Sequence, residues 1–145
     1  MSRTRTCVCL LAVIAAATAA VAQTPGFQVI VHPSNPIDSI SVKELSRYFL
    51  KKDTTWPDGR EIMVLDLNPD MPAREAFSLA VHDRNVSSIQ SYWQRQIFSG
   101  KGVPPVQFSS ENDVIAVVAD TPVAIGYVSA STAVGGRVKV LELKE

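Results

Sequence analysis

From residue 27 onwards, the chain alternates short apolar, β-branched runs with segments whose apolar residues recur at helical spacing. The expected strands are residues 27–31, 62–65, 123–128 and 138–143, and the expected helices are residues 42–49, 72–80, 86–97 and 111–118. Strands interleaved with helices are typical of a sheet covered by helices in two or three layers. The order therefore predicts one α/β domain with a mixed β-sheet flanked by helices.

Capping residues mark where these helices are expected to begin. Ser41 and Glu44 are spaced as in a capping box, and Ser110 opens a similar pattern. Asn85 is a favoured cap residue for the third helix. Pro72 falls in the first turn of the second helix, where the N–H that proline lacks has no helical partner.

The N-terminus has the three-part form of a secretory signal peptide. Arg3 and Arg5 precede residues 7–19, which are apolar apart from Thr18, and Ala20-Val21-Ala22 is an A-x-A cleavage site. The apolar run is shorter than the ~20 residues that cross a bilayer as a helix. We therefore predict a signal peptide over residues 1–22 and a periplasmic or secreted protein.

Cleavage leaves residues 23–145, a length that suits one domain with a hydrophobic core. Both cysteines, Cys7 and Cys9, lie in the predicted leader, which excludes disulfides and thiolate chemistry from the mature domain. All 14 acidic residues lie in the mature domain but two of the 14 basic residues do not, so its net charge is −2. Without a basic excess, we expect no nucleic-acid partner, and we expect no membrane insertion after cleavage.

Catalytic and metal-binding patterns are weak in this sequence. His32 and His82 are far apart and have no carboxylate at ligand spacing, and a basic group such as His82 suits the end of a helix. Asp66 and Asp70 are more simply explained by turn and cap roles than as an acid–base pair. We therefore predict a protein that is not an enzyme, with no catalytic residues, no metal site and no cofactor.

The segment from Asn68 to Arg74 is the best candidate for ligand binding. It leaves the carboxyl end of a predicted strand and enters a helix N-terminus, which is where open α/β sheets bind ligands. Helix N-termini favour anions, and an arginine such as Arg74 can hold an oxyanion with two parallel hydrogen bonds. The alternative is that Arg74 is a solvated helix residue paired with Asp70 or Glu75.

Ser34 and Asn35 follow the first predicted strand, so they are candidates to face the same crevice as Asn68 and Arg74. The alternative, which we favour, is that Asn35-Pro36 only forms a turn before the first helix.

A series of short motifs in one order resembles the second lobe of the periplasmic phosphate-binding proteins that serve ABC transporters. The motifs are Asn35-Pro36, Leu45 with Phe49, Trp56-Pro57-Asp58-Gly59, Arg74 with Phe77, Trp93, Phe98-Ser99-Gly100-Lys101 and Ala124-Ile125-Gly126-Tyr127. The resemblance implies a single lobe of the periplasmic-binding-protein type and a non-enzymatic module that binds phosphate or a similar small oxyanion. It implies ligand-binding roles for residues Arg74, Asn68 and Ala73, together with Ser34 and Asn35.

The sequence departs from this family in two ways. Asp70-Met71-Pro72-Ala73 replaces the family's Ser-Gly-Thr element, which removes hydroxyl donors and one backbone N–H. The resemblance also lacks the first lobe, so we expect an open crevice and weak binding unless a protein partner or a second copy faces it. The alternative function is an envelope protein-interaction module that retains the lobe fold without binding a small ligand.

Overall fold

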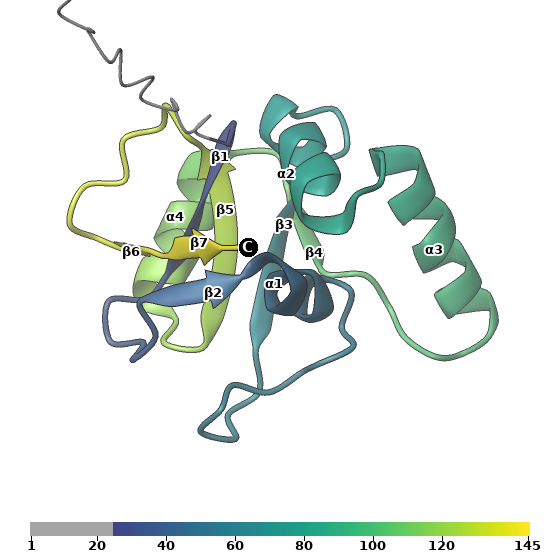
Figure 1. Cartoon of the computed structure of the whole chain (residues 1–145), viewed down its shortest axis with the longest axis horizontal. Coiled ribbons are helices and arrows are strands. Elements are labelled where there is room, and N and C mark those ends of the chain that lie inside the picture. Colours follow the sequence, from purple (N-terminus) through teal and green to yellow (C-terminus); the bar gives the residue numbers. More distant parts are fainter. Residues whose placement is uncertain (1–24) are drawn as a thin grey trace, which may run out of the picture.

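The computed structural model describes residues 25–145 (Figure 1). The predicted signal peptide lies outside the described residues. Within residues 25–145, no helix is long and apolar enough to cross a membrane.

The described chain confirms the predicted helices and most of the predicted strands. The strands are β1 (Phe27–Val31), β2 (Ser39–Ser41), β3 (Met63–Leu67), β4 (Val106–Phe108), β5 (Ala124–Ser129), β6 (Lys139–Val140) and β7 (Glu142–Lys144), and the helices are α1 (Val42–Phe49), α2 (Pro72–His82), α3 (Val86–Phe98) and α4 (Glu111–Asp120). The sequence pattern missed β2 and β4. It also predicted one strand over residues 138–143, where the structure has β6 and β7 in different sheets.

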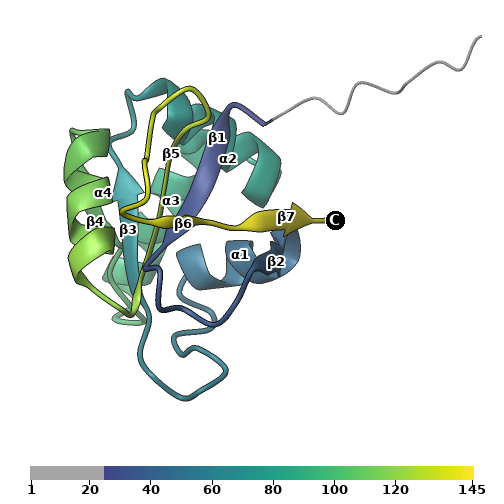
Figure 2. The same ribbon diagram turned by 90° about the vertical axis from the view of Figure 1, so that its left-hand side faces the viewer.

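The main sheet is mixed, as predicted, with the strand order β4-β3-β5-β1-β6. β3 pairs in parallel with β4 and β5, whereas β1 runs antiparallel to β5 and β6. β2 and β7 form a separate parallel pair. Helix α4 covers one face of the sheet, and α1 and α2 cover the other (Figure 2), so the fold has three layers.

The strand register defines two edges of the sheet. Ile125 of β5 is the partner of both Val31 at the end of β1 and Val64 near the start of β3. We call the edge where β3, β4 and β5 end the carboxyl edge, and the opposite edge the amino edge. Because β1 runs antiparallel to β5, the residues that follow β1 lie at the amino edge.

Aromatic rings join the sheet to α1 and α2. Phe77 of α2 stacks on Tyr127 of β5 with ring centroids 3.9 Å apart and planes 7° apart. Phe27 and Phe49 pack against the same two rings. All of these side chains are buried, so this cluster fixes the two helices on one face of the sheet.

On the face of the sheet that α4 covers, close packing depends on Gly126 of β5. A Cβ atom at this position would lie 2.8 Å from Cγ1 of Val114 in α4. The glycine that the sequence places in the middle of a strand therefore allows α4 to approach the sheet backbone.

The predicted caps are present at three helices. Ser41 accepts a hydrogen bond from the Glu44 N–H at 3.2 Å, Asn85 accepts one from Ser88 at 2.8 Å, and Ser110 caps α4. Helix α2 begins differently, with Met71 as the cap residue, no side-chain cap bond and Pro72 in its first turn.

Candidate functional site

The carboxyl edge holds the segment that the sequence predicts as the ligand site. Its backbone is fixed by hydrogen bonds from the Asn68 N–H to the Phe108 carbonyl at 2.9 Å and from the Met71 N–H to the Asn68 carbonyl at 3.1 Å. Asn68 is half-buried and Ala73 is buried. No side chain accepts a cap hydrogen bond from the first N–H groups of α2, and the acidic Glu75 lies in its first turn.

Arg74 does not lie on the surface of this edge, because only 2% of the residue is exposed. Its Nη1 donates to the Leu67 carbonyl at 3.0 Å and pairs with the carboxylate of Asp66. The predicted alternative partners, Asp70 and Glu75, are therefore wrong, as is the picture of a solvated arginine. Arg74 places a cation behind the first turn of α2, and that cation already has an internal counter-ion.

Asp66 is a buried member of strand β3, so the turn role expected from the sequence is wrong for this residue. Its Oδ1 accepts hydrogen bonds from the Tyr127 hydroxyl at 2.5 Å and from the Leu67 N–H at 2.8 Å. Burial raises the pKa of Asp66, and the charge of Arg74 and these hydrogen bonds oppose that rise. Burial and the nearby Asp66 carboxylate raise the pKa of Tyr127, which is a neutral donor at physiological pH.

Ser34 and Asn35 do not face the same crevice as Asn68 and Arg74. They follow β1, which runs antiparallel to β5, so they lie at the amino edge of the sheet. The prediction of a shared crevice is wrong because the local pattern gives no strand direction. The alternative prediction of a turn is confirmed, since the Asn35 N–H donates to the His32 carbonyl at 2.9 Å.

A second polar group at the carboxyl edge was not predicted. Glu111, at the start of α4, accepts from the Ser129 N–H at 3.0 Å, from the Ser129 hydroxyl at 2.6 Å and from the Thr132 hydroxyl. Burial opposes ionisation of this carboxyl, but these hydrogen bonds outweigh it and lower the pKa of Glu111. The Glu111 carboxylate therefore accepts hydrogen bonds from two hydroxyl groups at this edge. Glu111 is far from Ser129 and Thr132 along the chain, so no local sequence pattern could have indicated this contact.

The described residues contain no group of three or more histidine, cysteine, aspartate or glutamate side chains placed to hold a metal ion. His82 forms a hydrogen bond of 2.8 Å between its Nδ1 and the Ser46 hydroxyl. Burial, followed by the nearby charges of Arg74, Arg84 and Lys52, lowers the pKa of His82 to about 4. The prediction that His82 serves as a cation at the helix end is therefore wrong, because its ring is neutral at pH 7.

Comparison with known proteins gives a fold but no sequence family. No family model matches the chain. No curated protein matches it either.

Several solved structures share this fold, and those reported below carry names from phosphate transport. An ABC-type phosphate transport receptor from Vibrio cholerae has a TM-score of 0.64 and 18% identity, and the match covers 81% of this chain and 46% of that chain. A putative phosphate ABC transporter substrate-binding protein from Clostridium perfringens, with bound phosphate, has a TM-score of 0.65 and 19% identity over 81% and 44% of the two chains. PstS from Borrelia burgdorferi has a TM-score of 0.57 and 17% identity over 83% and 47%.

The chain therefore resembles phosphate ABC transporter substrate-binding proteins and has their α/β fold. It spans less than half the length of each of these proteins, which is consistent with a single lobe. At these identities the likeness is one of fold.

Proposed function

We propose that this chain is a non-enzymatic binding module that holds phosphate or a similar small oxyanion weakly at its carboxyl edge. The observation that carries the proposal is its fold, which it shares with substrate-binding proteins of phosphate transporters. The uncapped N-terminus of α2 lies directly after β3, which is the place where α/β sheets bind anions.

The proposed site uses a smaller set of groups than the sequence predicts. The Ala73 N–H and the side chain of Asn68 donate to the anion, and the buried Arg74 contributes its positive charge from the next position of α2. Ser34 and Asn35 are not part of this site, because they lie at the opposite edge. Pro72 supplies no N–H and Asp66 offsets the charge of Arg74, so we expect a Kd of about 1 mM or weaker, equivalent to ~4 kcal/mol of binding energy.

The predicted leader and domain boundaries belong to the same proposal. Residues 1–22 direct the protein to the periplasm or outside the cell, and residues 23–145 form the binding lobe. The carboxyl edge is open to water, which competes for each donor, so a second copy or a protein partner covering it strengthens binding. The resemblance in fold supports a role beside an ABC transporter as part of this proposal.

A second candidate function is an envelope protein-interaction module that binds no small anion. The observation that favours it is the buried ion pair between Arg74 and Asp66, which already compensates the charge of Arg74 within the protein. Under this function, the lobe fold provides a docking surface alone.

A phosphate titration followed by amide NMR on residues 23–145 separates the two candidates. At constant ionic strength and up to ~20 mM phosphate, the first candidate predicts saturable shifts for the Ala73 and Glu75 amides. Asn68→Asp adds a negative charge at the helix start and is expected to weaken binding at least ~10-fold. Gln94→Glu, which adds the same charge on an exposed position of α3, is expected to change nothing. Absence of saturable shifts in the unmodified domain contradicts the first candidate and leaves the second.

A further inference from the structure

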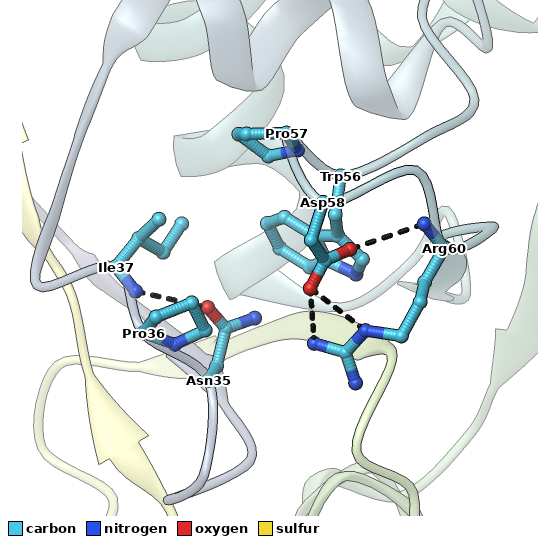
Figure 3. A pocket seen from close by; sticks show the side chains of 7 residues that line it. All are labelled: Asn35, Pro36, Ile37, Trp56, Pro57, Asp58 and Arg60. Carbon is cyan, nitrogen blue, oxygen red and sulfur yellow. Dashed lines mark hydrogen bonds and ion pairs between the residues drawn. The ribbon is translucent and has the colours of Figure 1, made fainter.

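A pocket of about 300 Å³ (Figure 3) lies at the amino edge of the sheet. The proposed anion site is at the opposite edge. One wall is the turn after β1, and the other is the loop that precedes β3. The lining residues are Asn35, Pro36, Ile37, Trp56, Pro57, Asp58 and Arg60. The volume falls at the lower end of the range typical of small-molecule sites.

Asn35 holds an amide group in a fixed orientation in this pocket. Only 3% of the residue is exposed. Its Oδ1 accepts from the Ile37 N–H at 3.1 Å, and its backbone carbonyl accepts from Nζ of Lys139 at 2.5 Å. Because a backbone N–H requires an acceptor, the side-chain atom facing Ile37 is the oxygen, and Nδ2 is the atom turned away.

The Nδ2 group of Asn35 is a buried donor, and no described residue accepts a hydrogen bond from it. Figure 3 shows this nitrogen on the side of Asn35 that faces Arg60. Buried amide groups in folded proteins nearly always have a hydrogen-bond partner. An orphaned donor that is held rigidly at a pocket wall therefore indicates the position of an acceptor atom in a ligand.

The remaining walls are apolar and rigid. Pro36, Ile37 and Pro57 line the pocket together with the ring of Trp56. The indole Nε1 of Trp56 donates to the Val123 carbonyl at 3.1 Å, so the only polar atom of this side chain is already bonded within the protein. These walls favour an apolar ligand body, and they offer no further donor.

The pocket rim carries two charges that cancel. The Arg60 guanidinium donates to the Asp58 carboxylate through Nε at 2.8 Å, and Nη2 lies 2.8 Å from the same carboxylate. A tight turn brings the two together, since the Gly59 N–H donates to the Trp56 carbonyl at 2.8 Å and Gly59 has a φ of 86°. A ligand carboxylate would meet Asp58, and a ligand ammonium would leave the Asn35 donor unpaired.

We propose that this pocket binds an uncharged organic molecule with an apolar body and one carbonyl group, such as a ketone, ester or amide. The carbonyl oxygen accepts the hydrogen bond from Asn35 Nδ2, and the body packs between Trp56 and the two prolines. The site is independent of anion binding, because it lies at the other edge of the sheet.

Two probes of matched shape test this proposal on residues 23–145 by NMR. Acetophenone has a flat apolar ring and one carbonyl acceptor, and in α-methylstyrene a CH₂ group replaces that oxygen. Acetophenone is expected to shift the Asn35 side-chain amide and the Trp56 indole resonance saturably, and α-methylstyrene to bind about tenfold more weakly. Intermolecular NOEs from acetophenone to Ile37 and Trp56 place the probe in the pocket.

The matched variants are Asn35→Asp and Asn85→Asp. Asn35→Asp keeps the acceptor for the Ile37 N–H but removes the donor, and it is expected to weaken acetophenone binding about tenfold. Asn85→Asp makes the same change at the cap of α3 and is expected to have no effect.

Equal binding of the two probes to the unmodified domain overturns the carbonyl assignment. Absence of saturable shifts at Trp56 and Asn35 up to ~10 mM acetophenone overturns the site itself. These two measurements do not depend on the folding of any variant. A phosphate titration that shifts only the Ala73 region does not bear on either result.

Discussion

The guanidinium of Arg74 and the carboxylate of Asp66 form a buried ion pair that joins the first turn of α2 to strand β3. Tyr127 extends this network to β5 through its hydrogen bond to Asp66. The network therefore holds the segment between Asn68 and Ala73 in place at the carboxyl edge. Burying two opposite charges costs desolvation free energy, so the structure depends on both partners being present.

Removal of Arg74 is expected to destabilise the domain strongly. Arg74→Ala leaves the Asp66 carboxylate buried without its counter-ion, which typically costs about 3–5 kcal/mol. Urea unfolding of the variant followed by circular dichroism measures the loss in the free energy of unfolding.

The matched control is Arg47→Ala. Arg47 forms an ion pair with Asp53, but their side chains are 47% and 38% exposed. Solvent screens such pairs, so the control is expected to keep the unfolding midpoint of the unmodified domain within experimental error. If Arg74→Ala unfolded at the same urea concentration as Arg47→Ala, the buried pair would not stabilise the fold.

Helix positions could be predicted from the sequence because their signals are local. Ser41, Asn85 and Ser110 each precede an apolar stripe and satisfy N–H groups only three residues away. The strands β2 and β4 were missed because each has only three residues, and two of the β4 residues are exposed. Such short pieces become strands through their partners in the sheet rather than through their own pattern.

The arrangement of the candidate site was harder to predict from the sequence than the helix positions. Asp66 and Arg74 meet only because β3 and α2 fold back on each other, whereas the sequence alone pointed to the acids closest to Arg74 in the chain, such as Asp70 or Glu75. Ser34 and Asn35 were misplaced because a strand pattern is the same in both directions. The direction of β1 is set by its pairing with β5, which is about a hundred residues away along the chain.

The close approach of α4 to the sheet leaves no room for a side chain at Gly126. Gly126→Ala places a methyl group 2.8 Å from Cγ1 of Val114, and overpacking of this kind typically costs about 1–3 kcal/mol. Thermal and urea unfolding measure the loss. Gly102→Ala is the matched control, because a Cβ atom at Gly102 meets nothing within 4 Å.

A double-mutant cycle with Val114→Ala tests the cause of this loss. Removing the valine methyl groups makes room for the new Cβ atom, so the two substitutions together are expected to cost less than their sum. Strict additivity would mean that the loss arises elsewhere in the strand.

His82 is expected to make the domain less stable as the pH falls from about 6.5 towards 4. Burial and neighbouring cations lower its pKa to about 4 in the folded state, so between these values the unfolded chain binds a proton that the folded chain does not. The full difference corresponds to about 3 kcal/mol. Urea unfolding of the unmodified domain and of His82→Gln between pH 7 and pH 4 measures the difference in slope.

The control for this pH dependence is His32→Gln, because the His32 ring lies in the turn after β1 and its Nδ1 bonds to the nearby Ser34. His82→Gln is expected to flatten the slope of the unmodified domain. Identical slopes for His82→Gln and the unmodified domain would show that His82 is protonated to the same extent in the folded and unfolded states.

Glu111 is expected to stabilise the carboxyl edge only while it is ionised. Hydrogen bonds from Ser129 and Thr132 outweigh burial and lower its pKa in the folded state, so its contribution is present above the pKa of the unfolded chain. That contribution is lost as the pH falls through the lower pKa of the folded chain. Glu111→Gln removes the charge, so it is expected to be less stable than the unmodified domain at pH 7 and to approach it at pH 3.

Coupling to Ser129 separates this contact from a simple effect at the start of a helix. Ser129→Ala removes the hydroxyl donor, so it is expected to reduce the cost of a subsequent Glu111→Gln substitution, as measured by urea unfolding of all four proteins at pH 7. If the Glu111 charge interacted only with the α4 dipole, Glu111→Gln would lower the free energy of unfolding by the same amount with or without the Ser129 hydroxyl. Strict additivity would therefore assign the stabilisation to the helix N-terminus, and coupling assigns it to the contact that fastens α4 to the end of β5.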